Sequence, residues 1–582
     1  MLLVHRALIR HASAQGRRWV SFTDPIEQFV ATELDDVHDA LAAAESAALD
    51  GRWVAGFVSY DAGPAFDGAI ASHRDARVPL VAMASFADAR PSRGPAGRAF
   101  TTGEWTPTDD QPGYEAAVAT IRDHIAAGET YQVNYTMRLR SAFDGDPEGL
   151  FAALCRAQRA DHLAFVDLGD AVVCSASPEL FVRRTGRTVE TRPMKGTRPR
   201  HPDPARDRDL ADELIASEKD RAENTMIVDM ARNDLGRIAD TGSVRTTALH
   251  TIESYPTVHQ LTSTVTAETD VGLADLFGAT FPGASITGAP KVATSRIITE
   301  LETAPRGIYT GAVGLIEPGG DCEFNIAIRT AWVDRRDGSA EYGVGGGIVW
   351  DSNGTAEWDE AHDKARVLHR ATRPFRLLET LAWDPGAGPI LLDRHMRRLA
   401  DTAAHFGFDC DIDEVTRRLG AVRAEVPRRL RVLVAADGAI EVQVLDPPGR
   451  VTQGWHLAVD SLPVRRDDEF LRHKTTRRDR YEEATARFPD ADDVVLWNED
   501  GEVTETTIAN LVLELDGEAV TPAASSGLLP GTLRAELLAN GRIREAVITR
   551  EDLARAERIW AINSLRGWVP AALIDVGVSP SS

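Results

Sequence analysis

The chain has 582 residues, more than one hydrophobic core usually organises, so the sequence predicts at least two domains. Hydrophobic residues make up 43% and charged residues 26%, and no apolar run approaches the roughly 18 residues that cross a bilayer, which excludes a protein with helical membrane spans. The formal net charge of -24 opposes binding to a nucleic-acid backbone, and it means that an anionic substrate needs a local cationic or metal site.

The cysteines are few and far apart. None has C-x-x-C spacing, so the sequence predicts neither a disulfide framework nor a zinc site, and a reducing cytoplasm is the simplest expected location. The four cysteines are Cys155, Cys174, Cys322 and Cys410.

The N-terminal part of the chain has a mixed α and β pattern. Residues 19–189 combine short alternating strands with amphipathic helices, one of them expected at 114–127. A single long helix is predicted at 207–238, strand and turn signals follow, and a further helix is predicted at 356–370.

A new unit begins after this last helix. It contains strand-like runs at 429–435 and 493–497. We place the boundary near residue 373, which gives domains 1–373 and 374–582. The junction carries no Gly/Ser-rich or Pro-rich tether, so we expect the two halves to be packed together or joined by a short, stiff link.

Lys195 is the first candidate reactive residue. It lies in T-R-P-M-K-G-T-R-P-R, residues 191–200, before a glycine and among arginines. Neighbouring cations lower the pKa of a lysine and favour the neutral, nucleophilic amine. A solvated basic loop is the alternative interpretation of this segment alone.

Two predicted helices carry carboxylates on one face. Glu223 shares a face with apolar residues, while Glu357, Glu360 and Lys364 follow one another at helical spacing. Carboxylates from two helices could hold a hard cation such as Mg²⁺. Taken singly, each helix also fits an exposed, salt-bridged surface.

Glycines cluster in two further segments. F-P-G-A-S-I-T-G-A-P-K runs from Phe281 to Lys291 and Y-G-V-G-G-G-I-V from Tyr342 to Val349. Such backbone can approach an anion closely and offer N–H groups to carboxylates, which ordinary single-glycine turns do not require.

Together these segments resemble the chorismate-utilising enzymes, a family that includes anthranilate, isochorismate and salicylate synthases and aminodeoxychorismate synthase component I. The resemblance covers residues 50–370. Further matching stretches are G-E-T-Y-Q-V-N at 128–134, S-A-S-P-E-L-F at 175–181, A-E-N-T-M-I-V-D-M-A-R-N-D-L-G-R at 222–237, H-Q-L-T-S at 259–263, R-G-I-Y-T-G at 306–311 and N-I-A-I-R-T at 325–330.

The resemblance implies an α+β fold, a sandwich with large antiparallel sheets. It implies that Glu223 and Glu360 ligate Mg²⁺ with Glu357 close by, and that Glu179 is a general acid or base for the C4 hydroxyl of chorismate. The substrate-binding positions that it implies are Gln132, His259, Thr287, Tyr309, Arg329, Gly345 and Lys364.

Two positions choose within the family. Isochorismate and salicylate synthases have a water-activating lysine where this sequence has Gln132, and anthranilate synthases usually have alanine where it has Lys195. Lys195 resembles the aminodeoxychorismate synthase residue that attacks C2 before ammonia enters at C4. The implied product is 4-amino-4-deoxychorismate. No cysteine lies in a G-x-C-x-G turn, so ammonia is expected from a separate glutamine amidotransferase subunit.

The C-terminal half offers three parts of a pyridoxal-phosphate site. Lys474 lies in F-L-R-H-K-T-T-R, Glu505 is expected in a turn that enters an apolar strand, and Thr532 begins a predicted helix that can receive a phosphate. A surface basic turn is the alternative for Lys474 alone.

The order and spacing resemble class IV aminotransferases and aminodeoxychorismate lyases over residues 376–570. The resemblance implies a fold-type IV domain of two α/β subdomains and a possible homodimer. Lys474 would bond the cofactor, Glu505 would pair with its pyridine nitrogen, and Arg398, Thr532 and Ser564 would hold its phosphate.

The two resemblances together imply that the chain makes 4-aminobenzoate, because the lyase substrate is what the first half would produce. An anthranilate-type synthase fused to a class IV transaminase is the main alternative. A catalytically inactive scaffold that binds chorismate or pyridoxal phosphate is a second one.

Overall fold

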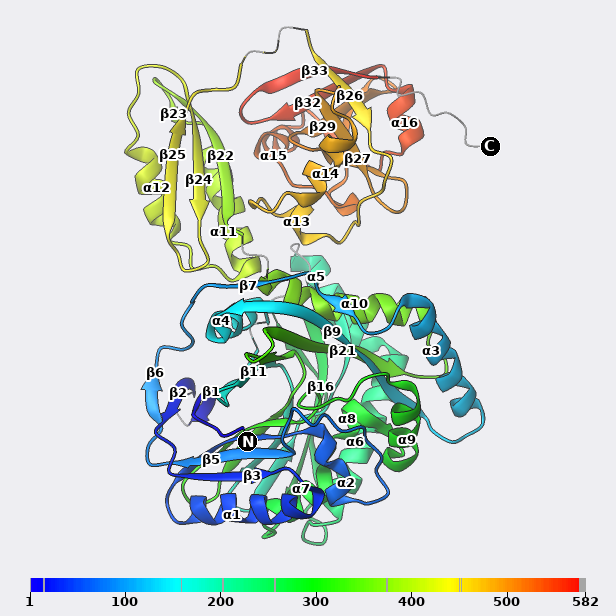
Figure 1. Ribbon diagram of the computed structural model, residues 1–582. Helices are drawn as coiled ribbons and strands as arrows, with labels where there is room; N and C mark the ends of the chain where they lie inside the picture. Colours follow the sequence, from blue (N-terminus) through cyan, green and yellow to red (C-terminus); the bar gives the residue numbers. More distant parts are fainter. Residues whose placement is uncertain are drawn as a thin grey trace. The chain divides into compact units, whose positions relative to one another are not determined.

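The computed structural model describes residues 2–13, 16–158, 160–200, 204–255, 258–372, 375–449, 451 and 453–574. The chain divides into two compact units, residues 1–373 and 374–582, coloured blue to green and green to red in Figure 1. The junction that the sequence places near residue 373 lies outside the described residues.

The N-terminal unit is built on two large antiparallel sheets. The first has eleven strands, in the order β17-β9-β21-β20-β11-β10-β1-β2-β6, with β7 and β8 paired to β9. Its strands are β1 (Arg6–Ser13), β2 (Gly16–Thr23), β6 (Arg90–Ser92), β7 (Phe100–Thr102), β8 (Thr106–Pro107), β9 (Gln132–Gly145), β10 (His162–Asp167), β11 (Ala171–Ser177), β17 (Gly288–Ala289), β20 (Thr330–Asp334) and β21 (Ser339–Ile348).

The second sheet has ten strands, in the order β14-β16-β13-β12-β19-β18-β4-β5-β3, with β15 paired to β16. Its strands are β3 (Glu27–Ala31), β4 (Trp53–Val58), β5 (Val81–Phe86), β12 (Leu180–Thr185), β13 (Thr188–Thr191), β14 (Met194–Pro199), β15 (Arg245–Ser254), β16 (Val258–Glu268), β18 (Ala312–Ile316) and β19 (Cys322–Ile326).

Helices cover the outer faces of both sheets. The helices are α1 (Val37–Leu49), α2 (Gly63–Phe66), α3 (Gln111–Ala126), α4 (Pro147–Gln158), α5 (Pro204–Ala216), α6 (Glu218–Gly236), α7 (Leu273–Thr280), α8 (Ala284–Thr287), α9 (Lys291–Leu301) and α10 (Gly354–Thr372), with short 3₁₀ turns at Leu34–Asp36 and Tyr60–Ala62.

Three hydrophobic clusters show how these layers pack. One joins α3, α4 and α10 to the first sheet, a second joins α1, α6 and α7 to the second sheet, and a third fills the space between the sheets. Phe22 and Phe57, one from each sheet, are fully buried in the middle cluster. The predicted α+β sandwich is confirmed.

The predicted helices at 114–127 and 356–370 correspond to α3 and α10. The long helix expected at 207–238 is instead two helices, α5 and α6, which meet at Ser217. Ser217 has extended backbone, and its side chain accepts a hydrogen bond from the Asp220 amide, so it caps the N-terminus of α6. A capping serine inside a helical pattern explains why periodicity alone missed the break.

The C-terminal unit has two subdomains, as predicted. The first is a four-stranded sheet, β23-β22-β24-β25, with two helices packed on one face. Its elements are β22 (Leu377–Asp384), β23 (Gly388–Pro389), α11 (Leu392–Phe406), α12 (Ile412–Gly420), β24 (Arg428–Val434) and β25 (Ile440–Leu445).

The second subdomain is an eight-stranded mixed sheet, β28-β27-β26-β33-β32-β29-β30-β31. It contains β26 (Trp455–Val459), α13 (Glu469–Arg472), α14 (Asp479–Arg487), β27 (Asp493–Trp497), β28 (Val503–Thr506), β29 (Asn510–Leu515), β30 (Glu518–Pro522), a 3₁₀ turn (Ala524–Ser526), α15 (Thr532–Ala539), β31 (Arg544–Ala546), α16 (Arg550–Arg555), β32 (Arg558–Asn563) and β33 (Gly567–Leu573). In neither unit does any described helix have the length and apolar character that a membrane span requires.

Candidate active sites

Lys195 and Gln132 meet over the glycine-rich strand β21. A Cβ placed on Gly347 would lie 2.2 Å from Nε2 of Gln132 and 3.1 Å from Nζ of Lys195, so only glycine leaves room for both side chains. Gln132 is fully buried, and neither its side-chain oxygen nor its nitrogen has a hydrogen-bond partner among the described residues. A buried amide with unused donors and acceptors is suited to a polar ligand.

The pKa of Lys195 is lowered, first by burial and then by the positive charge of Lys364. The charges of Glu223, Glu179 and Glu360 act in the opposite direction. The sequence predicts that the neighbouring arginines lower this pKa, whereas in the structure burial is the largest cause.

Glu179 lies between β11 and β12 and is almost completely buried. Its Oε1 accepts a hydrogen bond of 2.8 Å from Oγ of Ser285. Burial raises the pKa of Glu179 to about 7, although Ser285 and the charge of Lys195 oppose the rise. A carboxyl that titrates near neutrality can both give and take a proton, as general acid–base catalysis requires.

The carboxylates of α10 gather beside Gly346. A Cβ on Gly346 would lie 3.2 Å from Nζ of Lys364, 3.3 Å from Oε2 of Glu357 and 3.7 Å from Oε1 of Glu360. Lys364 pairs with Glu360 at 2.7 Å and donates to the carbonyl oxygen of Gly345 at 2.8 Å. The helical spacing therefore does place these three side chains together.

Glu223 comes to the same region from α6. The next residue, Asn224, is fully buried and donates to the carbonyl oxygen of Leu261, while its Oδ1 accepts from Ser263, so α6 is fixed against β16 at this turn. Burial raises the pKa of Glu223, with the charge of Lys195 opposing and that of Glu360 adding to the rise. The Glu223 and Glu360 carboxylates are thus near enough to repel each other.

These carboxylates fit Mg²⁺ by their chemistry. Burial raises the pKa of Glu357 as well, whereas Lys364 lowers that of Glu360. The donors are all oxygens, and an added cation would relieve their repulsion. Among the described residues no three acids, histidines or cysteines form a ready-made metal cage. Mg²⁺ commonly uses one or two carboxylates and completes its shell with water and substrate, so Glu223 and Glu360 suffice.

Three predicted substrate-binding residues border the first sheet. Thr287 is fully buried at the end of α8, and its Oγ1 has no hydrogen-bond partner among the described residues. Arg329 has a backbone φ of 52°, unusual for a residue other than glycine. Its Nε is also buried, and no described residue accepts a hydrogen bond from it. Tyr309 is buried, which raises its pKa, and the positive charge of Arg329 reaches it.

His259 is placed differently. Its Nδ1 lies 2.9 Å from Oγ of Ser254, and its Nε2 lies 3.0 Å from Oδ1 of Asp207. Both ring nitrogens therefore have partners on β15 and α5, outside the group formed by Lys195 and the carboxylates. Substrate contact by His259 requires one of these bonds to be exchanged.

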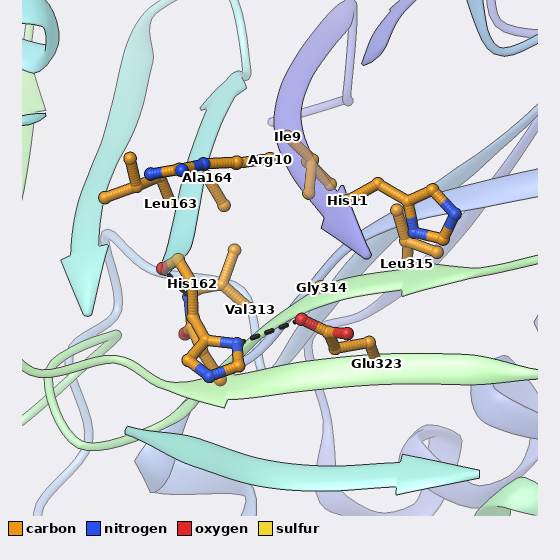
Figure 2. Close-up of a pocket in the computed structure, with 11 residues that line it drawn as sticks. Ile9, Arg10, His11, His162, Leu163, Ala164, Val313, Gly314, Leu315 and Glu323 are labelled. Atoms are coloured by element: carbon orange, nitrogen blue, oxygen red, sulfur yellow. Dashed lines mark hydrogen bonds and ion pairs between the residues drawn. The ribbon is translucent and has the colours of Figure 1, made fainter. Parts of the chain in front are cut away.

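A separate small pocket lies between the two sheets (Figure 2). It is lined by residues of β1, β10, β18 and β19 and contains none of the predicted site residues. Glu323 is held there by His162 at 2.9 Å and by Arg17 at 2.8 Å. Burial raises the pKa of Glu323, but His162 and the two arginines Arg17 and Arg183 outweigh it and keep the carboxylate charged. The polar residues of this pocket thus form an ion-pair network inside the core of the sandwich.

In the C-terminal unit, Lys474 follows α13 at the meeting of the two subdomains. Its carbonyl oxygen accepts from the amide of Leu378 on β22. The pKa of Lys474 is lowered to about 8, first by burial and then by the charge of Arg398, with Glu379 and Glu505 opposing. An amine with this pKa has a much larger neutral fraction near physiological pH than an ordinary lysine, and attack on an aldehyde requires the neutral form.

Arg398 is held by Glu379, a buried residue that sequence reasoning missed. Nε and Nη2 of Arg398 each donate to a different oxygen of Glu379 at 2.8 Å, and Nη1 donates to the carbonyl oxygen of Pro530. The sequence L-L-E-T-L contains Glu379 as an acid in an apolar strand, and this was the available signal.

His395 extends this network to Thr532. Nδ1 of His395 lies 2.7 Å from Glu379, and Nε2 lies 3.1 Å from Oγ1 of Thr532, the first residue of α15. Ser564 lies in the turn after β32. A helix N-terminus with a hydroxyl and a nearby arginine is a suitable phosphate site.

Glu505 is buried in strand β28, not in the turn that the sequence predicts. Oε1 accepts from Tyr481 at 2.8 Å and from the Leu529 amide at 3.1 Å, and Oε2 accepts from Asn510 at 3.3 Å. Burial raises the pKa of Glu505 to about 8, against the effect of these hydrogen bonds. The protonated ring nitrogen of pyridoxal phosphate would be a suitable partner for this carboxyl, because its positive charge would stabilise the buried carboxylate.

Comparison with known proteins assigns the two regions that contain these sites to families. The family described as "chorismate binding enzyme" matches residues 7–370. The chain belongs to the chorismate binding enzymes. Within this chorismate binding enzyme, residues 376–574 match a second family, "Amino-transferase class IV". Each candidate site lies within one of the two matched regions.

Curated relatives of the chorismate-binding region carry two different names. Aminodeoxychorismate synthase component 1 of Klebsiella aerogenes is 43% identical over 282 residues, 47% of this chain and 62% of the relative. Anthranilate synthase component 1 of Streptomyces coelicolor is 41% identical over 272 residues, 46% of this chain and 53% of the relative. This chorismate binding enzyme therefore spans less than two thirds of the length of either relative.

A solved structure shares the fold of the first unit. Anthranilate synthase component I from Streptococcus pneumoniae TIGR4 aligns with a TM-score of 0.52 and 25% identity, over 62% of this chain and 93% of that chain. The similarity supports the sandwich described above. It does not choose between the two names that the relatives carry.

Lysine content is a signal that sequence reasoning did not use. This chorismate binding enzyme has five lysines, and three of them, Lys195, Lys219 and Lys364, act electrostatically on the Glu360 carboxylate. Lys474 lies in the second site, and Lys291 pairs with Asp234. In a chain this poor in lysine, three lysines around one carboxylate indicate a functional region, and Lys219 belongs to it.

Proposed function

We propose that the chain converts chorismate to 4-aminobenzoate in two steps, one in each unit. The observation that carries the proposal is Lys195, a lysine of lowered pKa beside the buried amide of Gln132. The relatives named aminodeoxychorismate synthase and anthranilate synthase are almost equally similar, at 43% and 41% identity. The choice between them therefore rests on the chemistry of this lysine.

In the first step the neutral amine of Lys195 attacks C2 of chorismate, and the C4 hydroxyl leaves as water. Glu179, with a pKa of about 7, supplies the proton to that hydroxyl. Ammonia then bonds to C4 and displaces Lys195 from C2. The net change is replacement of the hydroxyl by an amino group, with the enolpyruvyl ether retained.

The substrate is a dianion and must enter a strongly acidic protein. Glu223 and Glu360 would hold Mg²⁺, which neutralises a substrate carboxylate. Nε of Arg329 and Oγ1 of Thr287 have no hydrogen-bond partner in the part of the chain that the structure describes, so both can serve the substrate's oxygens directly. These contacts fix the substrate with C2 toward Lys195.

In the second step pyridoxal phosphate would supply an electron sink for the amino group of the intermediate. Glu505 would hold the pyridine nitrogen, and Arg398, Thr532 and Ser564 would surround the phosphate. Lys474, with a pKa of about 8, removes the proton from C4. Loss of pyruvate then makes the ring aromatic.

The direct test is incubation of the purified protein with chorismate, Mg²⁺, a high ammonium concentration and pyridoxal phosphate. The products are separated by chromatography and identified by mass. We expect 4-aminobenzoate and pyruvate in equal amounts. Anthranilate would show that the first half is an anthranilate-type synthase, and keto acid formation dependent on an amino donor would identify the second half as a transaminase.

Variants of Lys195 test the first step separately. Lys195→Ala removes the nucleophile, and Lys195→Arg keeps a positive charge without a neutral amine. Both should lower the rate of chorismate amination by about 10³-fold or more, while added aminodeoxychorismate is still converted to 4-aminobenzoate. Unchanged 4-aminobenzoate output from chorismate would remove Lys195 from the mechanism.

A further inference from the structure

Behind Tyr309 lies a buried network of two arginines and one glutamate. Arg138 is 1% exposed, Arg306 is 3% exposed and Glu302 is 4% exposed. Arg306 donates to both oxygens of Glu302, at 3.0 and 2.7 Å, and Nη2 of Arg138 lies 3.6 Å from Oε2 of the same carboxylate. Arg138, Arg306 and Tyr309 also line one small cavity. Burying three charged groups is expensive, and apolar side chains would fill the same space at lower cost.

The ring of Tyr309 rests on Arg138. The guanidinium carbon lies 4.8 Å from the ring centroid, a distance typical of a cation–π contact. Arg138 and Gly343 are directly paired across β9 and β21. A Cβ on Gly343 would lie 2.3 Å from the Tyr309 ring, so the ring occupies the space that a side chain at residue 343 would fill.

Hydrogen bonds fix the guanidinium beneath this ring. Nη1 of Arg138 donates to Oγ1 of Thr136 at 2.9 Å, and Nε donates to the carbonyl oxygen of Pro305 at 3.2 Å. Thr136 in turn donates both its amide and its hydroxyl to Glu302, at 2.9 and 2.7 Å. The cation is therefore held in one orientation, and the ring stacked on it is held too.

Arg306 ties the same network to other parts of the candidate site. It donates to the carbonyl oxygen of Ile286, beside Thr287, and to that of Asn134, each at 2.7 Å. Its own carbonyl oxygen accepts from the amide of Tyr309 at 3.0 Å. Arg306 thus links α8 and strand β9 through its side chain, and the turn that carries Tyr309 through its backbone.

The turn after Tyr309 needs such support. Thr310 has a φ of 61°, a left-handed conformation that a β-branched residue adopts only at a cost in energy. Its Oγ1 lies 3.4 Å from Nη1 of Arg306. The network therefore holds a strained turn as well as the ring that precedes it.

We propose that Arg138 and Arg306 are positioning residues for the first reaction. They fix the ring and hydroxyl of Tyr309, and with it the α8 segment, before a substrate carboxylate arrives. This inference rests on the proposed function of the N-terminal unit and deepens it. The buried charges lower the stability of the fold. In exchange, Tyr309 is already fixed in place and loses little conformational freedom when the substrate binds.

A double-mutant cycle between Arg138 and Tyr309 tests the inference. Arg138→Met removes the cation and its hydrogen bonds but keeps an unbranched side chain. Tyr309→Phe removes only the hydroxyl. Each single variant should raise KM for chorismate about tenfold in the ammonium-dependent assay. If Arg138 acts through the hydroxyl, adding Arg138→Met to Tyr309→Phe should raise KM by less than about threefold further. Fully multiplicative effects would overturn the inference.

Matched variants keep the outcome decisive. Arg140→Met changes an exposed arginine two residues along β9 and should leave KM unchanged. If Arg138→Met does not fold, Arg138→Lys carries the same cycle, because an ammonium keeps the charge without the planar stack and the paired hydrogen bonds. Unchanged KM in folded Arg138→Lys would also overturn the inference. If the unmodified protein does not consume chorismate, the proposed function fails instead.

Discussion

Burial and the positive charge of Arg398 lower the pKa of Lys474. Replacing it by alanine removes the amine, and replacing it by arginine keeps a positive charge that cannot form the covalent bond to the cofactor. Both variants should lose the visible absorbance of bound pyridoxal phosphate. Both should also stop the pathway at aminodeoxychorismate, because proton removal from C4 depends on the same amine. Absorbance spectra and product analysis from chorismate provide the measurement.

A control must show that the Lys474 variants still fold when no cofactor is bound. Thermal unfolding without cofactor should differ little from that of the unmodified protein. An unchanged absorbance spectrum in Lys474→Arg would contradict the assignment of this lysine.

Glu505 should make the stability of the cofactor-free protein depend on pH. Its pKa rises from 4.5 to about 8 on folding. Between these pH values the unfolded chain has released the proton that the folded chain keeps. Raising the pH from about 5 to about 8 therefore removes stability, with a limiting slope of about 1.4 kcal/mol per pH unit for this one group.

Denaturant unfolding across this pH range would measure the slope, with hydrogen exchange of C-terminal peptides used to detect unfolding of the second unit. Glu505→Gln cannot lose a proton and should flatten it, whereas Glu518→Gln, at an exposed position, should not. Bound cofactor should also flatten the slope, because a pyridine nitrogen partner lowers the pKa of Glu505. The same slope in Glu505→Gln would show that another group titrates.

At the scale of single residues, the sequence predicts the reactive types better than their surroundings. It predicts Lys195, Lys474 and Glu505 from motifs and local spacing. It does not predict that burial dominates the Lys195 pKa, or that Glu505 lies inside a strand. Burial is set by segments distant in sequence, which no local pattern contains.

At the scale of elements, α6 and α10 bring carboxylates to one place. Glu360→Gln should weaken Mg²⁺ binding about tenfold or more, because it removes the negative charge of one of the two carboxylates proposed to ligate the metal. Asp359→Asn is the matched control, since it changes an exposed acid one residue away on α10. Calorimetric Mg²⁺ titration would measure the affinity, and activity against Mg²⁺ concentration should show the same shift. Equal Mg²⁺ affinities for the two variants would show that Glu360 does not ligate the metal.

Helical periodicity predicts which side chains share a face, and this succeeds for Glu357, Glu360 and Lys364. It fails at Ser217, where a capping hydroxyl ends one helical run and begins the next. The approach of Lys195 and Gln132 to the same glycine, Gly347, could not be predicted by periodicity, because these residues lie on different sheets. Long-range pairing of this kind depends on the whole topology.

At the scale of the molecule, composition and motifs predict two units and their fold classes, while the order of twenty-one strands in two sheets does not follow from them. The buried network of Arg138, Glu302 and Arg306 is a consequence of that order. Its arginines look like ordinary members of an arginine-rich chain until the sheets are assembled. Sequence motifs therefore identify the groups expected to touch substrate, and the assembled fold identifies the groups that hold them.

The source of nitrogen is also a property of the whole chain. Glutamine hydrolysis needs a thiolate nucleophile, yet burial raises the pKa of all four cysteines, to about 11 for Cys322. We expect ammonium to support 4-aminobenzoate formation and glutamine alone to give less than about 1% of that rate.

Adding a purified glutamine amidotransferase subunit should restore glutamine use, whereas the same subunit with its nucleophilic cysteine replaced should not. Glutamine-dependent product from the isolated chain would require a nucleophile other than these four thiols. Restoration by the active subunit at ammonia concentrations too low to support the free reaction would mean that ammonia passes between the proteins without mixing with solvent.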